Sequence, residues 1–160
     1  LGRFARERGL ELRFIEFMPL DADGAWNEET VLTGAEIRAR LEEHFGTLLP
    51  APRDDASQPA VDYEFADGSG RIGLIHPVSE PFCESCNRLR LTAEGQIRNC
   101  LFSHAEWDAR ELLRSDVPDE QFDDQLRRLV RDCVAAKARA HGIGNPAFRQ
   151  PDRAMYQIGG

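Results

Sequence analysis

Three cysteines near the middle of the chain constrain its fold more than any other feature. They lie in the run PFCESCNRLRLTAEGQIRNCLF with the spacing C-x2-C-x13-C, at Cys83, Cys86 and Cys100. No fourth cysteine stands nearby in the sequence. A metal centre held by three protein thiolates keeps one coordination position open, whereas four thiolates close the site. The spacing therefore predicts a metal site at which a further ligand can bind.

The charge around these cysteines is opposite to that of the whole chain. Twenty basic and 28 acidic residues give a net charge of −8, which argues against a nucleic-acid-binding protein. Between the first and third cysteines, however, Arg88, Arg90 and Arg98 outnumber two glutamates. A small cationic site on an acidic protein suits a small anion, so we expect an anionic ligand at the open position.

Hydropathy and the absence of a signal-peptide pattern favour the reducing cytoplasm or an organelle interior. No segment approaches the ~18 consecutive apolar residues that a membrane span needs, and no signal-peptide pattern is present. We therefore expect a cytoplasmic protein with no membrane contact, whose four cysteines serve as metal ligands or core residues rather than disulfides. The chain begins with Leu1 inside a helix-like run, which predicts that it is the C-terminal part of a longer protein.

The segment between the second and third cysteines is typical of a β-hairpin. A three-residue loop with Gly95 in the left-handed conformation is a common connection between two antiparallel strands. The resulting register sets Arg90 opposite Arg98. It also sets Arg88 opposite Cys100, so all four side chains share one face. The residues expected on the other face, toward a core, are Leu89, Leu91, Ile97 and Leu101.

The same cysteines also suit a structural zinc site in a non-catalytic interaction module. Zn²⁺ prefers four ligands, and the fourth could be Cys133, His76 or His104. Cys133 fits an apolar helical stripe, so we expect it in the core, and we expect both histidines at strand ends or caps. The spacing alone is compatible with zinc and with an iron–sulfur cluster. Arginines beside an incomplete ligand set favour the cluster.

The elements before the cysteines alternate as in an α/β protein. A helix ending at Gly9, followed at once by an apolar strand over 12–17, is the unit of a parallel sheet or barrel. Ligands of such folds gather at the carboxyl ends of strands, which places Met18 at a ligand edge. The other expected elements are a helix from the capping box at Thr33 and Glu36 to Gly46, an irregular linker over 50–60, strands over 61–66 and 71–76, and a helix over 119–139.

The cysteine segment closely resembles the second-cluster motif of the GTP 3′,8-cyclases, the radical SAM enzymes of molybdenum cofactor biosynthesis. The resemblance rests on HPVSEPFCESCNRLRLTAEGQIRNCLF and extends to RFIEFMPLDADGAWN, to HGIGNPAF and to the Gly-Gly end. It implies an α/β fold in which residues 1–49 form the last part of an incomplete (β/α) barrel. Residues 50–160 are then an α+β C-terminal domain that carries a second iron–sulfur cluster and GTP.

The resemblance also implies an activity, cofactors and partners. In this family a [4Fe-4S] cluster on an N-terminal C-x3-C-x2-C motif cleaves S-adenosylmethionine. The resulting radical takes a hydrogen atom from ribose C3′ of GTP. The C3′ radical then bonds to guanine C8, which gives (8S)-3′,8-cyclo-7,8-dihydroguanosine 5′-triphosphate. That N-terminal motif is absent here, so we expect this part alone to be inactive. A homodimer and, as pathway partner, cyclic pyranopterin monophosphate synthase are also implied.

Carried over motif by motif, the resemblance assigns each ligand to particular residues. The second [4Fe-4S] cluster, with one iron open to guanine, is assigned to Cys83, Cys86 and Cys100. GTP is assigned to Arg88, Leu89, Arg90 and Arg13. S-adenosylmethionine is assigned to Met18, and the tail that reaches into the active site to Gly159 and Gly160. An auxiliary-cluster domain of another radical SAM enzyme is the other catalytic alternative, although such domains usually carry more cysteines.

Overall fold

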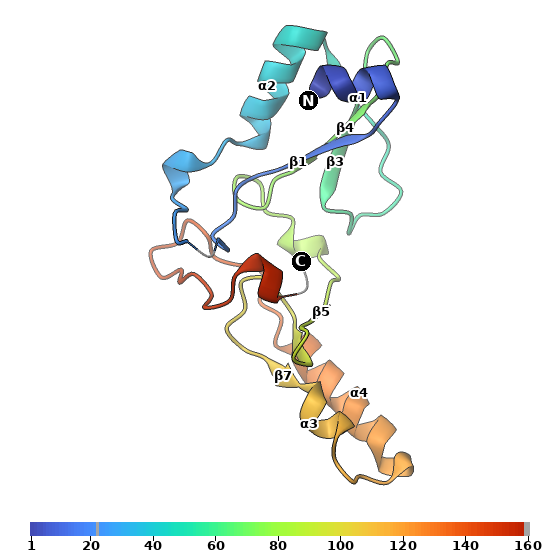
Figure 1. Cartoon of the computed structure of the whole chain (residues 1–160), viewed down its shortest axis with the longest axis vertical. Coiled ribbons are helices and arrows are strands. Elements are labelled where there is room, and N and C mark those ends of the chain that lie inside the picture. The colour runs from blue at the N-terminus through green and yellow to red at the C-terminus, as the bar shows by residue number, and fades with distance from the viewer. Residues whose placement is uncertain (22, 159–160) are drawn as a thin grey trace. The chain divides into compact units, whose positions relative to one another are not determined.

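The computed structural model describes residues 1–21 and 23–158, and the chain divides into two compact units. Unit 1 comprises residues 1–18 and 26–86, and unit 2 comprises residues 19–25 and 87–160. Each unit combines helices with a small sheet (Figure 1), so the chain is a mixed α/β protein, as the sequence indicates. The predicted boundary after residue 49 and the barrel interpretation stay predictions.

Unit 1 is built on a four-stranded sheet with the order β1-β4-β3-β2. The strands are β1 (Leu12–Ile15), β2 (Leu48–Pro50), β3 (Ala60–Phe65) and β4 (Arg71–Ile75). β1 runs parallel to β4, with Phe14 opposite Leu74, and the other neighbours are antiparallel. The parallel pair confirms the expected helix–strand unit, because β1 directly follows the first helix.

The helices of unit 1 begin and end where local sequence signals predict. α1 (Gly2–Arg8) ends at Gly9, whose φ of 62° is the left-handed conformation that favours glycine. α2 (Gly34–Phe45) begins at Thr33, whose hydroxyl accepts a hydrogen bond from the Glu36 N–H at 3.3 Å. The Glu36 carboxylate accepts from the Thr33 N–H at 2.9 Å, so the capping box is confirmed. Two short 3-10 helices complete the unit, η1 (Glu28–Thr30) and η2 (Cys83–Ser85).

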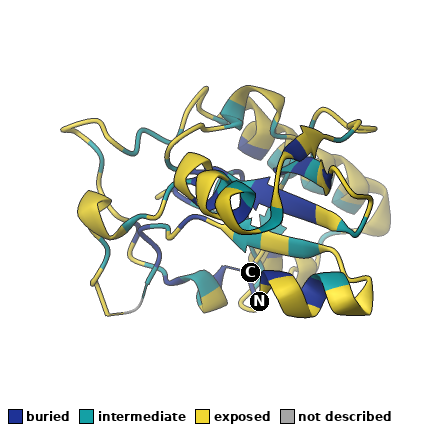
Figure 2. Ribbon diagram, turned by 90° about the horizontal axis from the view of Figure 1, so that it is seen from above, coloured by how far each residue is buried: buried dark blue, intermediate teal, exposed yellow. Residues whose placement is uncertain are grey.

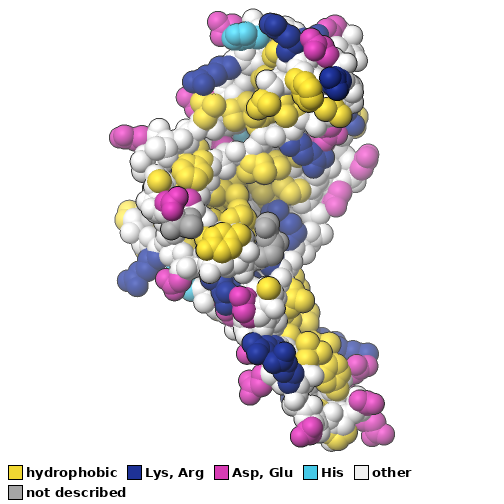
Figure 3. Space-filling view, in the orientation of Figure 1, with side chains coloured by type: hydrophobic (Ala, Val, Ile, Leu, Met, Phe, Trp, Pro, Cys, Tyr) yellow, Lys and Arg dark blue, Asp and Glu magenta, His cyan; other side chains and the backbone are white. Residues whose placement is uncertain are grey.

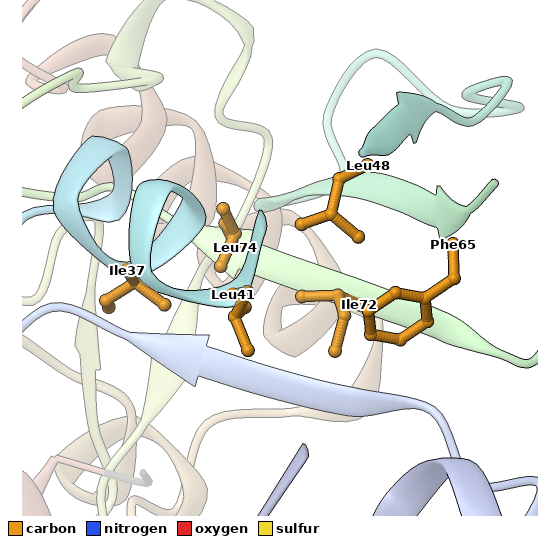
Figure 4. Close-up of a cluster of buried hydrophobic side chains, with 6 residues drawn as sticks. All are labelled: Ile37, Leu41, Leu48, Phe65, Ile72 and Leu74. Carbon is orange, nitrogen blue, oxygen red and sulfur yellow. The ribbon is translucent and has the colours of Figure 1, made fainter. Parts of the chain in front are cut away.

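The core of unit 1 lies between α2 and the sheet. Figure 4 shows Ile37 and Leu41 of α2 directed toward Ile72 and Leu74 of β4. Leu48 of β2 and Phe65 of β3 complete the buried cluster. Figure 2 shows that buried residues lie along the middle strands and that the outer sides of the helices are exposed. Full burial of one such side chain stabilises the fold by roughly 1.5–3 kcal/mol.

Unit 2 pairs a three-stranded antiparallel sheet with two helices. Its elements are β5 (Arg90–Leu91), β6 (Gln96–Arg98), β7 (Trp107–Asp108), α3 (Ala109–Leu113), α4 (Asp119–Ala135) and η3 (Met155–Gln157). The core consists of Ile97, Ala109 and Cys133, with Leu129 and Val130 of α4 packed against it. Figure 3 shows hydrophobic side chains along the α3–α4 part between charged ones, as expected for amphipathic helices.

Several element ends differ from the sequence prediction. β1 stops at Ile15 instead of residue 17, because its partner β4 ends at the paired residue Ile75. β2 occupies 48–50 and so runs into the predicted linker, which is confirmed only over 51–59. α4 ends at Ala135 instead of residue 139. Within the described ranges, no helix is long and apolar enough to cross a lipid bilayer.

Candidate cluster and nucleotide site

The first two predicted cluster ligands lie on one tight turn of unit 1. Cys83 opens the 3-10 turn η2, and the Cys86 N–H donates to the Cys83 carbonyl at 3.2 Å. Both side chains are half-buried. A C-x2-C pair folded in this way brings the two residues together by local backbone hydrogen bonding alone.

The third predicted ligand, Cys100, lies in unit 2 directly after β6 and Asn99. It is half-buried, and its carbonyl accepts from the Ser103 N–H at 3.3 Å. Among the residues that the structure describes, no three His, Cys, Asp or Glu side chains form a group that could hold a metal ion. The three-cysteine ligand set therefore stays a prediction, supported by the chemistry of three half-buried thiols, which suits an iron–sulfur cluster.

The hairpin between these cysteines has the predicted register. Arg90 lies opposite Arg98, and the Thr92 N–H donates to the Gln96 carbonyl at 2.9 Å. Gly95 has a φ of 87°, so the left-handed turn is also confirmed. The paired residues of β5 begin only at Arg90, so the predicted opposition of Arg88 and Cys100 lies beyond the paired strands.

The prediction that the alternate leucines face a core is wrong for two of them. Leu89 is 39% exposed and Leu91 is 62% exposed, whereas Ile97, opposite Leu91, is buried as predicted. The reason is the placement of α4, which contacts β6 and β7. Leu91 lies on β5, one of the two edge strands of this sheet, whereas Ile97 lies on the central strand β6.

The guanidinium of Arg98 is bound inside the protein instead of being available to an anionic ligand. Arg98 is only 2% exposed and donates to the Glu106 carboxylate and the Ser103 carbonyl, and weakly to the Leu101 carbonyl at 3.4 Å. The expectation that Arg98 shares an anion site with Arg88 and Arg90 is therefore wrong. In the folded chain Arg98 binds the carboxylate of Glu106, which lies eight residues further along the sequence.

Glu106 also binds a second arginine. Its two carboxylate oxygens accept from Arg153 Nε at 2.6 Å and from Arg153 Nη2 at 3.0 Å, a bidentate pair. The hydrogen bonds from Arg153 lower the pKa of Glu106 against the opposing effect of burial, and those from Arg98 lower it further. Glu106 thus remains an anion that balances both guanidinium groups. Arg88 and Arg90 are the other two arginines of the motif.

Arg88 and Arg90 are both half-buried, at the start of the hairpin. The backbone on either side of the hairpin is held by a residue that the sequence did not point out. Lys137 Nζ donates to the Arg88 carbonyl at 3.0 Å and to the Asn99 carbonyl at 2.7 Å. The sequence feature that could have pointed to Lys137 is that it is the only lysine of the chain.

Two of the remaining predicted contacts, Arg13 and Met18, lie on or directly after the first strand. Arg13 lies on β1 opposite Gly73, is exposed, and donates from Nε to Glu11 Oε1 at 2.6 Å. Its stem lies close over Gly73, where an added Cβ would come within 2.9 Å of Arg13 Cγ. Met18 is half-buried in the segment that follows β1, at the carboxyl end where it was predicted. The predicted tail residues Gly159 and Gly160 lie outside the described residues.

Glu16, another residue that sequence reasoning missed, anchors the loop that leads to the cysteine turn. The residue is 2% exposed, and its carboxylate accepts from the N–H groups of Gly34 at 2.8 Å, Val78 at 2.9 Å and Ser79 at 2.9 Å, and from the Ser79 hydroxyl. Burial would raise the pKa of Glu16, but these hydrogen bonds outweigh it and hold the pKa below its usual value. A charged residue inside the apolar run LRFIEF was the available sequence signal.

The alternative zinc ligands occupy the places expected of non-ligands. Cys133 is buried in the core of unit 2, as predicted, and burial raises the pKa of its thiol. His76 directly follows β4, at a strand end as predicted, and its Nδ1 lies 3.9 Å from Glu16 Oε1. His104 is exposed, with Nε2 3.2 Å from the Arg149 carbonyl oxygen.

Comparison with known proteins gives one consistent result. The profile of the family described as Molybdenum Cofactor Synthesis C matches residues 10–143. The whole chain is 48% identical to a GTP 3′,8-cyclase of Rhodopirellula baltica, of which it spans 44%. It is 45% identical, over 98% of its length, to a GTP 3′,8-cyclase of Paenarthrobacter nicotinovorans, and 42% identical, again over 98%, to one of Streptomyces coelicolor.

The chain spans less than half the length of these curated relatives, at 47% and 45% for the latter two. The matched part is their C-terminal part, in agreement with the resemblance seen in the cysteine motif. The profile match covers most of the chain and includes the C-x2-C turn and the hairpin. The chain therefore belongs to the Molybdenum Cofactor Synthesis C family, the C-terminal region of GTP 3′,8-cyclases of molybdenum cofactor biosynthesis.

Proposed function

We propose that this chain is the part of a GTP 3′,8-cyclase that holds an auxiliary [4Fe-4S] cluster and binds GTP. In this proposal residues 1–49 complete a (β/α) radical SAM barrel, and the enzyme carries out the first step of molybdenum cofactor biosynthesis. The observation that carries the proposal is the position of Arg88 and Arg90. They directly follow the turn formed by Cys83 and Cys86, in a chain that is 48% identical to a GTP 3′,8-cyclase.

Cys83, Cys86 and Cys100 would hold the cluster, since three thiolates leave one iron without a protein ligand. When bound, the cluster supplies a Lewis-acidic iron that can accept a guanine nitrogen or oxygen. The turn at η2 would contribute two thiols from one short segment, and the end of the hairpin would contribute the third. Cys133 would not take part, because it belongs to the core of unit 2.

Arg88 and Arg90 would bind GTP through charge-assisted hydrogen bonds. A guanidinium is a rigid fork of donors that matches phosphate or guanine acceptors with two parallel bonds. The intervening Leu89 is exposed and lies before the paired strands begin, so its backbone would be available for the GTP contact expected there. Arg13 would bind a phosphate group by exchanging its ion pair with Glu11 for the ligand.

The rest of the enzyme's chemistry would depend on groups beyond this GTP site. Met18 would line the S-adenosylmethionine site from the end of β1, and Gly159 and Gly160 would form the tail that approaches the substrate. The cluster that generates the radical requires a C-x3-C-x2-C motif, which this sequence does not contain. On its own, the chain would therefore bind GTP without converting it.

GTP binding to arginine variants under anaerobic conditions tests this proposal. We expect Arg88→Ala and Arg90→Ala each to weaken GTP binding by about tenfold or more, because a charge-assisted hydrogen bond contributes roughly 1.5–3 kcal/mol. Iron content should stay at the level of the unsubstituted protein. The matched control is Arg127→Ala, which removes an exposed arginine of α4 in the same unit. Loss of iron together with GTP in the arginine variants would show that these residues maintain the fold instead of binding the nucleotide.

A further inference from the structure

The only lysine among twenty basic residues connects two backbone carbonyls in unit 2. The chain uses arginine at its 19 other basic positions. Lys137 follows the C-terminal end of α4, and its backbone N–H donates to the Val134 carbonyl at 3.0 Å. Its half-buried ammonium donates to the carbonyls of Arg88 at 3.0 Å and Asn99 at 2.7 Å.

The chemistry of the contact explains why lysine stands here. An ammonium is compact and carries three donors in tetrahedral directions, so one nitrogen can bind two carbonyl oxygens from different segments. A guanidinium spreads its donors over a wider plane and is better matched to carboxylates and phosphates. In a chain that otherwise uses arginine, this site needs the small cation.

The two carbonyls lie where strand pairing stops. The β5–β6 pairs include Arg90 with Arg98 but do not extend to Arg88. Beyond that pair, the two segments are joined by the Lys137 ammonium, which binds the carbonyls of Arg88 and Asn99 in place of a direct backbone hydrogen bond between the strands. One of the connected segments carries Arg88 and Arg90, and the other continues from Asn99 into Cys100.

Asn99 is held from a second direction. It is 4% exposed, and its side-chain Nδ2 donates to the Cys133 carbonyl at 2.9 Å. That carbonyl belongs to the last turn of α4, where backbone acceptors lack partners within the helix. The end of α4 therefore fixes the segment that precedes Cys100 through Asn99, and fixes both segments through Lys137.

We propose that Lys137 is a positioning residue for GTP recognition. It holds the segment of Arg88 and Arg90 at a set separation from the segment of Cys100, so that two guanidinium groups and one thiolate can act on the same ligand. Lys137 acts through the backbone and does not itself touch GTP. This inference rests on the proposed function, since it concerns the site at which GTP would bind.

Removal of the ammonium should weaken GTP binding without removing the cluster. We expect Lys137→Met, which keeps the length and apolar stem of the side chain, to weaken GTP binding by roughly 10–100-fold, the usual effect of losing a supporting group. Lys137→Arg should recover part of the affinity, because a guanidinium can still donate to one of the carbonyls. Arg139→Met is the matched control, as it removes an exposed cation two residues further along the chain.

The test measures iron content, GTP affinity and amide hydrogen exchange in the anaerobically prepared protein at its natural full length. The inference predicts weaker GTP binding in Lys137→Met at unchanged iron content, with faster exchange confined to residues 86–91 and 99–101. Unchanged GTP affinity in Lys137→Met, while the unsubstituted protein binds GTP, would overturn the inference and leave the proposed function standing. So would faster exchange throughout unit 2 together with loss of iron, which indicates a general structural role.

Absence of GTP binding to the unsubstituted, cluster-loaded protein would instead overturn the proposed function. The positioning role in GTP recognition would then fall with it, whatever the iron content of the variants. The exchange pattern would still decide whether Lys137 joins the two segments. The two failures are thus distinguished by the behaviour of the unsubstituted protein.

Discussion

At the scale of single residues, the buried carboxylate of Glu16 shows how a charge can be accommodated inside this fold. A carboxylate removed from water costs several kcal/mol unless donors replace its hydration. Glu16 meets this requirement with three backbone N–H groups and one hydroxyl. The donors come from the start of α2 and from the loop before the cysteine turn, so one side chain connects three segments of unit 1.

Glu16→Gln tests this connection. An amide places an NH₂ group where the carboxylate accepted hydrogen bonds, so at least one N–H donor would lose its partner while buried. We expect the free energy of unfolding to fall by about 2 kcal/mol or more, as measured by urea denaturation. Glu43→Gln, on the exposed side of α2, is the control and should change stability little. Equal stability of both variants would mean that the four hydrogen bonds to Glu16 contribute nothing net.

The same residue predicts a pH dependence. The pKa of Glu16 is lower in the folded protein than in the unfolded chain, because its hydrogen bonds outweigh burial. Its contribution to stability is then complete above the unfolded carboxyl pKa of about 4.3 and is lost as the pH falls through the lower folded value. The measurement is the denaturation midpoint at a series of pH values from about 6 down to about 3, a range that includes that pKa. The midpoint should fall less steeply with falling pH for Glu16→Gln than for the unsubstituted protein. Parallel curves would contradict the assignment.

At the scale of elements, the hairpin of unit 2 depends on the conformation of one turn. Gly95 adopts a φ of 87°, and its carbonyl accepts from the Ala109 N–H at 3.0 Å and the Arg110 N–H at 3.3 Å. An added Cβ would lie 2.7 Å from Arg110 Cβ. The turn therefore needs glycine for its backbone conformation and for its close contact with the start of α3.

Gly95→Ala should destabilise the protein by more than Gly142→Ala. Gly142 has a similar φ of 82°, but an added Cβ there meets no atom within 4 Å. Both variants incur the left-handed strain of about 1–2 kcal/mol, and only Gly95→Ala adds a clash. The difference between their unfolding free energies measures the contact between the hairpin and α3. A smaller loss of stability in Gly95→Ala than in Gly142→Ala would mean that the start of α3 moves away from the added Cβ at little energetic cost.

The core of unit 2 gives a prediction that separates packing from metal binding. Cys133 lies under β6 with its thiol in an apolar environment that raises its pKa. We expect Cys133→Ala to cost about 1–2 kcal/mol of stability through lost packing, with no change in metal content. The measurement combines thermal unfolding with metal analysis. A loss of bound metal in this variant would identify Cys133 as a fourth ligand and favour a closed zinc site.

The sequence predicts well those features that neighbouring residues determine. The capping box at Thr33, the left-handed turn at Gly95 and the hairpin register all follow from local hydrogen bonding, and the structure confirms them. The burial of Arg98 and the exposure of Leu91 do not follow, because they depend on a distant carboxylate and on which strands α4 covers. The same limit applies to Lys137, whose partners are 49 and 38 residues away.

At the scale of the whole molecule, the predicted cluster ligands come from both units. Cys83 and Cys86 belong to unit 1 and Cys100 to unit 2, whereas Cys133 is in the interior of unit 2. The chain belongs to the Molybdenum Cofactor Synthesis C family and spans less than half the length of the GTP 3′,8-cyclases that it matches. The proposed GTP site depends on the identity of the metal centre that these cysteines would hold.

The metal centre can be identified by iron, sulfide and zinc analysis of the anaerobically prepared chain. We expect about four iron and four sulfide per chain, the content of one [4Fe-4S] cluster. Both should be lost in Cys83→Ala, Cys86→Ala and Cys100→Ala, and retained in Cys133→Ala. One zinc per chain without iron or sulfide, or an iron content that survives Cys100→Ala, would show that these three cysteines do not hold such a cluster.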